Sequence, residues 1–302
     1  MALTLKKNYA SLESSASNLY ELSDDDIKQM HQVLLEIYED LWAFCERHRL
    51  KLIAGGGTAL GTVRHKGFIP WDDDMDLNLV RTDYQKFIKF FDDELGDKYD
   101  LLAPGYKGGA SCFLMRVMKK NTTLLNMIDE TTPYPSGIYI DITPIDYAPD
   151  NKVLQIIKGR IADLLRFCSY SVYWKQYKSN SLKDFMMNSE GKTYYKLRIA
   201  VGTILSFRSA EKWFATFDRF IRGRKSKFVT VAAGRKKYCG EIFGYDTFFP
   251  LKKALFENRE IYVYRDIDTY LKGLYGNYMK IPDVKDREKH LCLKLDFDKS
   301  EK

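Results

Sequence analysis

Polar and apolar residues alternate strictly over residues 74–79, which is the pattern of a strand with one buried face. The apolar positions, which we expect to face the core, are Met75, Leu77 and Leu79. The polar positions on the opposite face are Asp74, Asp76 and Asn78, joined by Asp72 if the strand begins early. Alternate residues of a strand lie roughly 6.5–7 Å apart, so carboxylates on this face can share one or two metal ions. The same alternation directs Asp73 to the other side and predicts a structural role for it.

A helix and a glycine turn precede this strand. Ser23 is followed by three aspartates, and apolar residues then recur at helical spacing, which predicts a helix over residues 24–48. Residues 50–54 are apolar and end at Gly55-Gly56-Gly57, which indicates a strand leading into a tight turn. Residues 58–65 are expected to form one or two helical turns, whose first N–H groups would face whatever the glycines admit.

The rest of the chain predicts further strands and then helices. We expect a helix from Asp83 to about Phe91, strands over 111–118 and 137–143, helices over most of 151–230, a polar connector at 180–192, and short strands with a helix after 238. In the helical part, apolar residues keep helical spacing at Val153, Ile156, Ile157, Ile161, Leu164, Leu165 and Cys168. Asp83 and Asp146 are expected to be a cap and a turn residue.

These elements predict an α+β fold, with a mixed β-sheet core flanked by helices and a mostly helical basic annex. We divide the chain into a flexible N-terminus (1–22), a catalytic core (23–150), a basic helical segment (151–235) and a C-terminal part that packs back on the core (236–302).

Composition and charge add two constraints. The five cysteines are scattered and form no CxxC pair, which indicates neither a disulfide framework nor a zinc cluster and fits a reducing cytoplasm. The start of the chain lacks the apolar stretch of a signal peptide, and no run approaches the ~18 apolar residues of a membrane span.

Residues 151–235 hold 18 Lys and Arg against 5 Asp and Glu within a chain of net charge +7. This segment suits an anionic partner such as a membrane surface, and a solvated helical face explains it equally well.

A glycine turn followed by an acidic strand can hold a nucleotide phosphate beside a divalent metal ion, because glycines admit the phosphates and carboxylates bind Mg²⁺. A further carboxylate, Asp141, lies in the otherwise apolar run GIYIDI. A buried Asp without a partner is costly, so we prefer a metal ion as its partner, with a buried hydrogen bond as the alternative. The turn, the acidic pair and the third acid together resemble the nucleotidyltransferase superfamily, in which three carboxylates hold two Mg²⁺ ions against a nucleotide.

A longer stretch carries a more specific likeness. The run GGGTALGTVRHKGFIPWDDDMDLNL (55–79) closely resembles the signature of the LicD family, the bacterial phosphocholine transferases related to fukutin and fukutin-related protein. The likeness extends to GIYIDITPIDYAP (137–149), to FENREIYVYRDIDTYLKGLYGNYM (256–279) and to KIPDVKDREKH (280–290). It implies a nucleotidyltransferase-like fold and a transferase that moves a phospho-alcohol from a CDP-activated donor to a sugar hydroxyl and releases CMP. Relatives use choline, ribitol or glycerol as the alcohol.

The resemblance also implies site residues. The positions that match metal-binding carboxylates are Asp74, Asp76 and Asp141, and those expected near the nucleotide phosphates are Gly56, Gly57, Thr58, Arg64 and Lys66. The expected cofactor is Mg²⁺, as two ions, or Mn²⁺ in its place. His290 matches a family position to which we assign no role, and Arg265 departs from the family by replacing a proline after a short strand.

The expected partners are a CDP-alcohol donor, a glycan or lipid-linked oligosaccharide acceptor and an anionic membrane surface contacted peripherally from the cytoplasm, but no nucleic acid. Two alternatives remain. A nucleotidyltransferase would pass an NMP from an NTP to a small acceptor with the same glycines and carboxylates, but it would not explain RHKGFIPWDDD. A basic binding module with a relic site would bind anions without recognising a donor in the presence of Mg²⁺. The sequence does not select the alcohol or the acceptor sugar.

Overall fold

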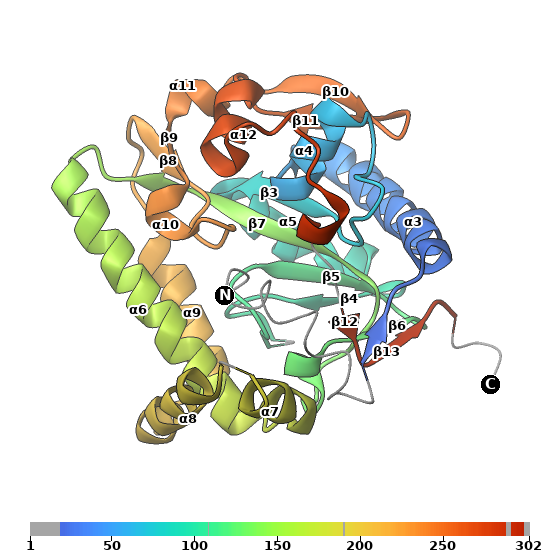
Figure 1. Ribbon diagram of the computed structural model, residues 1–302. Coiled ribbons are helices and arrows are strands. Elements are labelled where there is room, and N and C mark those ends of the chain that lie inside the picture. Colours follow the sequence, from blue (N-terminus) through green and yellow to red (C-terminus); the bar gives the residue numbers. More distant parts are fainter. Residues whose placement is uncertain (1–18, 108, 190, 288–290, 299–302) are drawn as a thin grey trace.

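The central feature is a mixed sheet of nine strands in a computed structural model that describes residues 19–107, 109–189, 191–287 and 291–298. The strand order is β10-β11-β2-β3-β7-β5-β4, with β8 added to β7 and β9 to β8 (Figure 1). The strands are β2 (Ile53–Ala54), β3 (Asp76–Val80), β4 (Tyr99–Leu102), β5 (Met115–Lys119), β7 (Tyr139–Ala148), β8 (Phe228–Thr230), β9 (Ile242–Gly244), β10 (Lys252–Phe256) and β11 (Arg259–Val263). β3 pairs with β7 and β11 with β2 in parallel, and the other pairs are antiparallel. The fold class is α+β, as the sequence predicts.

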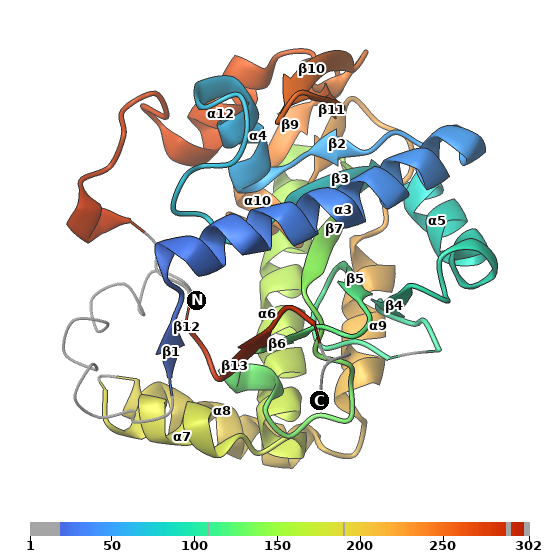
Figure 2. The same cartoon turned by 90° about the vertical axis from the view of Figure 1, so that its right-hand side faces the viewer.

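The helix α3 (Asp24–His48) covers one face of this sheet and begins where the sequence predicts. The Ser23 hydroxyl accepts the N–H of Asp26 at 3.2 Å, and the Asp26 carboxylate accepts the N–H of Ser23 at 2.8 Å, which completes a capping box. Its buried face is formed by Met30, Val33, Leu34, Ile37, Tyr38, Leu41, Phe44 and Cys45. Figure 2 shows α3 in front of the strands, with α6 (Lys152–Gln176) and α9 (Ala210–Ile221) behind them. The sheet therefore lies between two layers of helices.

The helical layer on the far side comes from the basic segment. Its helices are α6 (Lys152–Gln176), α7 (Asn180–Met187), α8 (Lys192–Leu205) and α9 (Ala210–Ile221). These helices share a second hydrophobic core with large buried aromatic residues, namely Tyr173, Trp174, Phe214 and Phe217. The predicted connector at 180–192 is wrong in part, because Ser179 caps α7 and accepts the N–H of Leu182 at 2.9 Å. Helix α7 has only a few apolar residues, and they pack on this second core. They are too few to form the long amphipathic pattern that predicts a helix.

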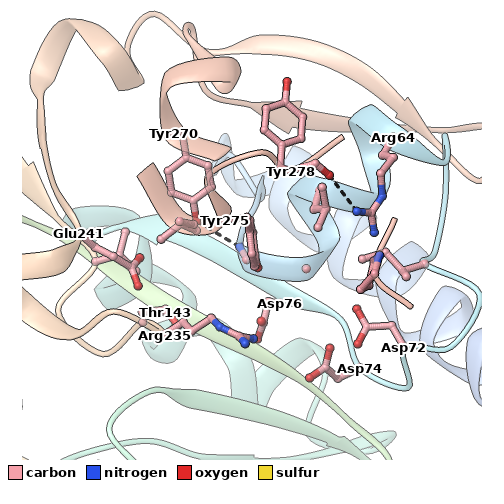
Figure 3. A pocket seen from close by; sticks show the side chains of 18 of the residues that line it. Arg64, Asp72, Asp74, Asp76, Thr143, Arg235, Glu241, Tyr270, Tyr275 and Tyr278 are labelled. Atoms are coloured by element: carbon pink, nitrogen blue, oxygen red, sulfur yellow. Dashed lines mark hydrogen bonds between the residues drawn. The ribbon is translucent and has the colours of Figure 1, made fainter. Parts of the chain in front are cut away.

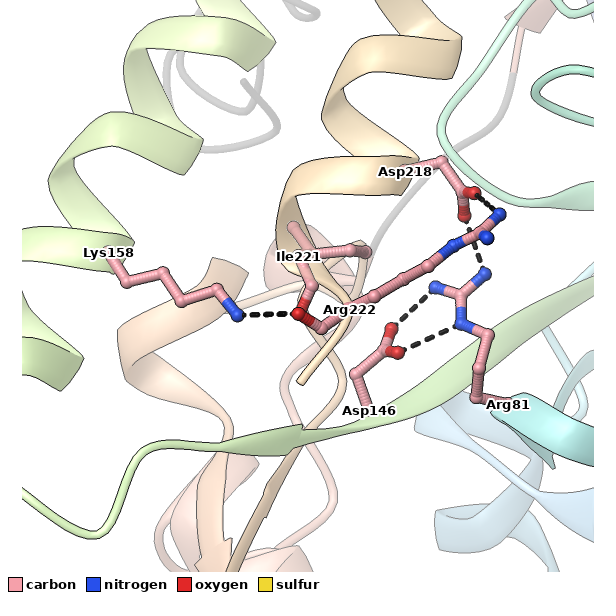
Figure 4. Close-up of polar contacts among 6 residues, drawn as sticks. All are labelled: Arg81, Asp146, Lys158, Asp218, Ile221 and Arg222. Atoms are coloured by element: carbon pink, nitrogen blue, oxygen red, sulfur yellow. Dashed lines mark hydrogen bonds and ion pairs between the residues drawn. The ribbon is translucent and has the colours of Figure 1, made fainter. Parts of the chain in front are cut away.

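A buried ion network joins this helical layer to the sheet (Figure 4). Arg81, at the start of α5 (Arg81–Glu94), donates to both oxygens of Asp146 at 2.8 and 2.5 Å and to Asp218 of α9 at 2.6 Å. Arg222 binds the other oxygen of Asp218 at 2.6 Å. The prediction of Asp146 as a turn residue is wrong: Asp146 is 2% exposed within β7, because Arg81 supplies the charge partner that allows its burial.

Several element boundaries differ from the predictions, and in β7 the cause is pairing with another strand. α5 begins at Arg81 with Val80 as its N-cap, so Asp83 lies in the first turn and is not the cap. β5 begins only at Met115, whereas β7 extends to Ala148, where it pairs with β8.

The remaining elements are short. They are α4 (Gly56–Arg64), α10 (Lys237–Gly240), α11 (Tyr245–Phe248), α12 (Ile267–Tyr275), two 3₁₀ turns (Met127–Asp129 and Val284–Asp286), and the paired strands β1 (Tyr20–Glu21) with β12 (Leu291–Cys292) and β6 (Thr123–Leu125) with β13 (Lys294–Asp296). Within the described ranges, every helix is too short or too polar to cross a bilayer. His290 and most of the predicted flexible N-terminus (residues 1–18) lie outside the described residues.

Candidate active site

The acidic end of β3, the glycine turn and the C-terminal part of the chain enclose a cavity of about 460 Å³ (Figure 3). Its polar and charged lining includes Arg64, Asp72, Asp74, Asp76, Asn78, Thr143, Arg235 and Glu241, and its aromatic lining is Trp71, Tyr270, Tyr275 and Tyr278. Residues 56–78 thus meet residues 231–287, which are far away in the sequence. The described residues concentrate acidic, basic and aromatic groups in this one cavity.

The three glycines leave room for polar side chains of the strand and the loop before it. A Cβ at Gly55 would lie 2.7 Å from the amide nitrogen of Asn78, and one at Gly56 would lie 2.7 Å from a carboxylate oxygen of Asp76. At Gly57 the corresponding atom is a carboxylate oxygen of Asp72, again at 2.7 Å. Gly56 also has a φ of +41°, which favours glycine. The turn therefore needs glycine so that it can approach the acidic side chains closely.

Hydrogen bonds fix the turn to the start of β3. The N–H of Gly55 donates to the carbonyl of Asp76 at 3.0 Å, and the N–H of Asp76 donates to the Thr58 hydroxyl at 2.9 Å. The hydroxyl of Tyr270, on α12, accepts the N–H of Gly56 at 3.1 Å. Gly56 and Gly57 line the cavity, whereas Thr58 is 4% exposed and lies outside the lining. Thr58 thus holds the start of the acidic strand in place without lining the cavity itself.

Three consecutive acids precede β3 and lie close together. One carboxylate oxygen from each of Asp72, Asp73 and Asp74 lies within 4.8 Å of the others. Asp73 does not line the cavity of Asp72, Asp74 and Asp76, as alternation predicts, although its carboxylate stays close to theirs because regular strand structure begins only at Asp76. Asp72 and Asp74 line the same cavity as Asp76. Oxygen ligands in such a group suit a hard cation such as Mg²⁺.

The Asp76 carboxylate is strongly perturbed by its surroundings. Burial raises the pKa of Asp76 well above its ordinary value, and the negative charges of Asp74, Asp141 and Glu241 raise that pKa further. A cation beside Asp76 would remove this penalty. The environment of the Asp76 side chain therefore fits the predicted metal site.

Asp141 lies beside Asp76 but has a partner of its own. The two residues are direct neighbours in the parallel β3–β7 register, and direct neighbours share a face of the sheet. Asp141 accepts two hydrogen bonds from Arg116 of β5, at 2.8 and 3.0 Å, and it is not among the residues that line the cavity. The buried Arg116 guanidinium also stacks on Tyr139 at 3.6 Å. Of the three predicted metal ligands, two line the cavity and the third lies next to them in an ion pair.

Sequence reasoning did not identify Arg116 as part of the site. The available signal was a lone arginine in the otherwise largely apolar strand run MRVM, but nothing local places it opposite Asp141. Burial of a full ion pair requires this bidentate geometry.

The two basic residues predicted near the phosphates occupy different places. Arg64 lines the cavity and donates to the carbonyl of Tyr278 at 2.8 Å. Lys66 is exposed with a φ of +64°, lies outside the cavity lining, and accepts the N–H of Glu257 with its carbonyl. Arg64 is therefore the member of this pair that can reach a ligand.

Glu241 is the second functional candidate that sequence reasoning missed. This side chain is 1% exposed and accepts the N–H of Lys236 at 2.7 Å. Burial raises the pKa of Glu241 to about 7. No sequence motif marks Glu241, because Glu241 comes close to Asp76 only through the packing of the C-terminal part of the chain on the sheet.

Residues 50–153 match the family model described as LicD/FKTN/FKRP, nucleotidyltransferase domain. The lipopolysaccharide cholinephosphotransferase LicD of Haemophilus influenzae is 27% identical over 277 residues, which cover 87% of this chain and 95% of that protein. Two uncharacterized proteins, from Rickettsia typhi and Rickettsia prowazekii, are each 31% identical over 75 residues, which cover 25% of this chain and 23% and 27% of theirs.

The matched range contains the glycine turn, the acidic residues of β3 and Asp141, which are the features on which the predicted resemblance depends. Over residues 50–153 the chain therefore matches the model of the LicD/FKTN/FKRP nucleotidyltransferase domain, in agreement with the resemblance stated from the sequence.

Proposed function

We propose that this protein is a Mg²⁺-dependent phosphotransferase that moves phosphocholine from CDP-choline to a sugar hydroxyl of a glycan and releases CMP. The likeness to the Haemophilus influenzae cholinephosphotransferase supports the choice of group and acceptor class, because it covers nearly the full length of both chains. The observation that carries the proposal is that Asp74 and Asp76 line one cavity with the glycine turn.

The fit of a metal ion rests on the chemistry of this donor set. Asp74 and Asp76 would hold the metal, with Asp141 as the third carboxylate. A bound Mg²⁺ supplies Lewis-acid stabilisation of the diphosphate charge and of the leaving CMP. The two bonds from Arg116 occupy two of the roughly four lone-pair directions of the Asp141 carboxylate. Asp141 therefore keeps lone pairs with which it could bind a metal ion.

The protein's own groups orient the donor. Backbone approach at Gly56 and Gly57 and the guanidinium of Arg64 suit the diphosphate. Positioning and charge stabilisation supply most of the catalysis in phosphoryl transfer, so no covalent role is assigned to a side chain.

The cavity also supports choline over the uncharged alcohols. Trp71, Tyr270 and Tyr275 present aromatic groups in the same cavity as Glu241 and the acidic cluster. A quaternary ammonium group is attracted both to aromatic faces and to carboxylates. Glycerol and ribitol phosphate would gain little from these groups.

We propose a glycan or a lipid-linked glycan precursor as acceptor, and peripheral contact with the inner face of the cytoplasmic membrane. The basic balance of residues 151–235, with 18 Lys and Arg against 5 Asp and Glu, supports the contact.

The test is a donor panel with CDP-choline, CDP-glycerol, CDP-ribitol and NTPs, each with and without Mg²⁺, and a glycan acceptor. We expect Mg²⁺-dependent CMP release that is fastest with CDP-choline. Release of pyrophosphate from an NTP would instead support the nucleotidyltransferase alternative. CMP release that persists unchanged in EDTA would contradict the metal assignment.

A further inference from the structure

The outer face of α6 carries a row of large apolar side chains that the fold leaves in solvent. Their exposed fractions are 62% for Val153, 54% for Leu154, 56% for Ile156, 50% for Ile157, 40% for Ile161 and 60% for Leu164. Scattered exposed apolar residues are normal at protein surfaces, but a continuous set on one helix marks an interaction surface. We call this set the α6 apolar face.

Folding does not use the α6 apolar face. Positions 153, 157, 161 and 164 follow one another at helical spacing on one side of the helix. The core-facing side of α6 is formed instead by Ala162, Ser169, Val172 and Tyr173, which are buried. The helical spacing predicted from the sequence is confirmed, yet these side chains lie opposite the protein core. Helix α6 is thus apolar on two sides.

Helix α8 packs on the C-terminal part of α6 (Figure 1), and α8 and the turn after it carry further exposed apolar groups. Leu197, Ile204 and Phe207 are 51%, 75% and 80% exposed. Gly202 and the buried Arg198 form the side of α8 that contacts α6, since the Arg198 guanidinium donates to the carbonyl of Phe167 at 3.1 Å. The apolar groups of α8 therefore lie on a different side from its contact with α6.

The charges around these apolar groups are almost all positive. Helix α8 contains no acidic residue, and Asp163 is the only one in α6. Exposed basic residues on the two helices include Lys152, Arg160, Lys192 and Lys196. A second copy of the chain packed symmetrically on this face would bring two basic surfaces together, which is unfavourable. An anionic lipid surface satisfies both the apolar and the basic groups.

We propose that the outer face of α6 and α8 docks on an anionic lipid bilayer, with its apolar side chains in the interfacial layer and its lysines and arginines at the lipid phosphates. The inference rests on the proposed function only in expecting an acceptor at the membrane. It names the surface that would make the peripheral contact.

The test is co-sedimentation of the full chain with vesicles of phosphatidylcholine alone or mixed with phosphatidylglycerol. We expect binding to the mixed vesicles that weakens as salt rises, because each basic residue near the surface contributes about five-fold to partitioning. The triple variant Ile157→Gln/Ile161→Gln/Leu164→Gln should bind at least about ten-fold more weakly, because its apolar contribution is lost.

Leu255→Gln is the matched control, because Leu255 is 58% exposed on β10, outside the two helices. It should bind like the wild type, and all variants should keep the wild-type melting temperature because the substituted side chains contribute little to the core. Binding of the triple variant at wild-type strength, or no wild-type binding to mixed vesicles, would overturn the proposal. So would light scattering that finds a wild-type dimer which the triple variant converts to a monomer.

Vesicle binding is measured without a CDP-alcohol donor, so the result does not depend on whether the proposed transfer reaction takes place. The effect of CDP-choline on the melting temperature, measured without vesicles, reports on the cavity alone. Loss of one signal with the other intact separates failure of the docking surface from failure of the proposed function.

Discussion

Replacing Asp76 by Asn should separate the metal-binding role of this carboxylate from its structural cost. Asp76 lines the cavity beside Asp74, and burial together with neighbouring acids raises its pKa. Asn keeps the shape of the side chain but removes its charge. We expect the variant to lose Mg²⁺-dependent activity and yet to be more stable than the wild type in EDTA.

The pH dependence of that stability has a definite sign. Because the pKa of Asp76 is higher in the folded than in the unfolded chain, the folded protein holds the proton more tightly. In EDTA the wild type should therefore lose stability as the pH rises from about 4 through this raised pKa, since unfolded Asp titrates near pH 3.9. Asp76→Asn should remove this contribution, so its advantage should be absent near pH 4 and largest at alkaline pH.

The size of the metal effect follows from linkage. Mg²⁺ at about 100 times its dissociation constant stabilises the folded state by about 2.7 kcal/mol. An unfolding entropy of about 2.1 cal/mol/K per residue gives about 0.6 kcal/mol/K for 302 residues, so the melting temperature should rise by about 4 °C. Loss of a metal ligand should weaken Mg²⁺ binding at least about 100-fold, because loss of a group that only hydrogen-bonds to a ligand already lowers metal affinity 10–100-fold. The shift in the variant then falls below about 1 °C.

The assay is differential scanning fluorimetry with and without Mg²⁺, together with CMP release from CDP-choline. Asp93→Asn, at an exposed position of α5, is the matched control and should retain both the shift and the activity. The reasoning fails if Mg²⁺ shifts Asp76→Asn as much as the wild type, or if the variant releases CMP within about ten-fold of the wild-type rate, since loss of one strong charge-stabilising group costs ~10²–10³.

Three further outcomes are expected. Arg81→Met leaves the buried Asp146 carboxylate without its guanidinium and should lower the free energy of unfolding by about 3–5 kcal/mol; a urea midpoint that does not move would contradict this. Gly56→Ala places a Cβ 2.7 Å from a carboxylate oxygen at a φ of +41° and should abolish CMP release, whereas Gly244→Ala, with its nearest atom at 3.7 Å, should be tolerated. Glu241→Gln removes a carboxyl group whose pKa burial raises to about 7. In EDTA it should therefore raise the unfolding free energy above pH 8 by up to about 3 kcal/mol and have little effect near pH 4.5, as urea titrations at both pH values would measure.

The parts of the fold that the sequence predicts well depend on local interactions. The start of α3 follows from Ser23 and the aspartates after it, because a capping box involves only neighbours in the chain. The buried positions Met75, Leu77 and Leu79 follow from alternation, and the glycine turn follows from its composition. The candidate site was predictable to the extent that its glycines and acids lie within one short run.

Other parts of the site depend on contacts that no local pattern encodes. Asp141 and Arg116 meet because β5 and β7 pair across the sheet, and Glu241 reaches the cavity from the C-terminal part. Periodicity also cannot tell which side of a helix faces the core. The apolar residues of α6 have the spacing of a core-facing set, yet the core is built from smaller and aromatic residues on the other side, such as Ala162 and Tyr173.

Asp141 differs from the other acids near Asp76 because it forms an ion pair with Arg116 outside the cavity lining. Asp141 accepts two hydrogen bonds from the buried Arg116 guanidinium, which also lies 3.8 Å from Asp129, so part of the negative charge of Asp141 is balanced inside the protein. Asp74 and Asp76 line the cavity on the same side as the glycine turn, together with Arg235, whose positive charge acts on Asp76 in the opposite sense to the acids. A divalent cation would find its most favourable position there, between the acids and the space that the glycines leave for phosphate. The same arrangement holds Asp141 in register beside Asp76, where we propose that it serves the metal ion with part of its charge already balanced by Arg116.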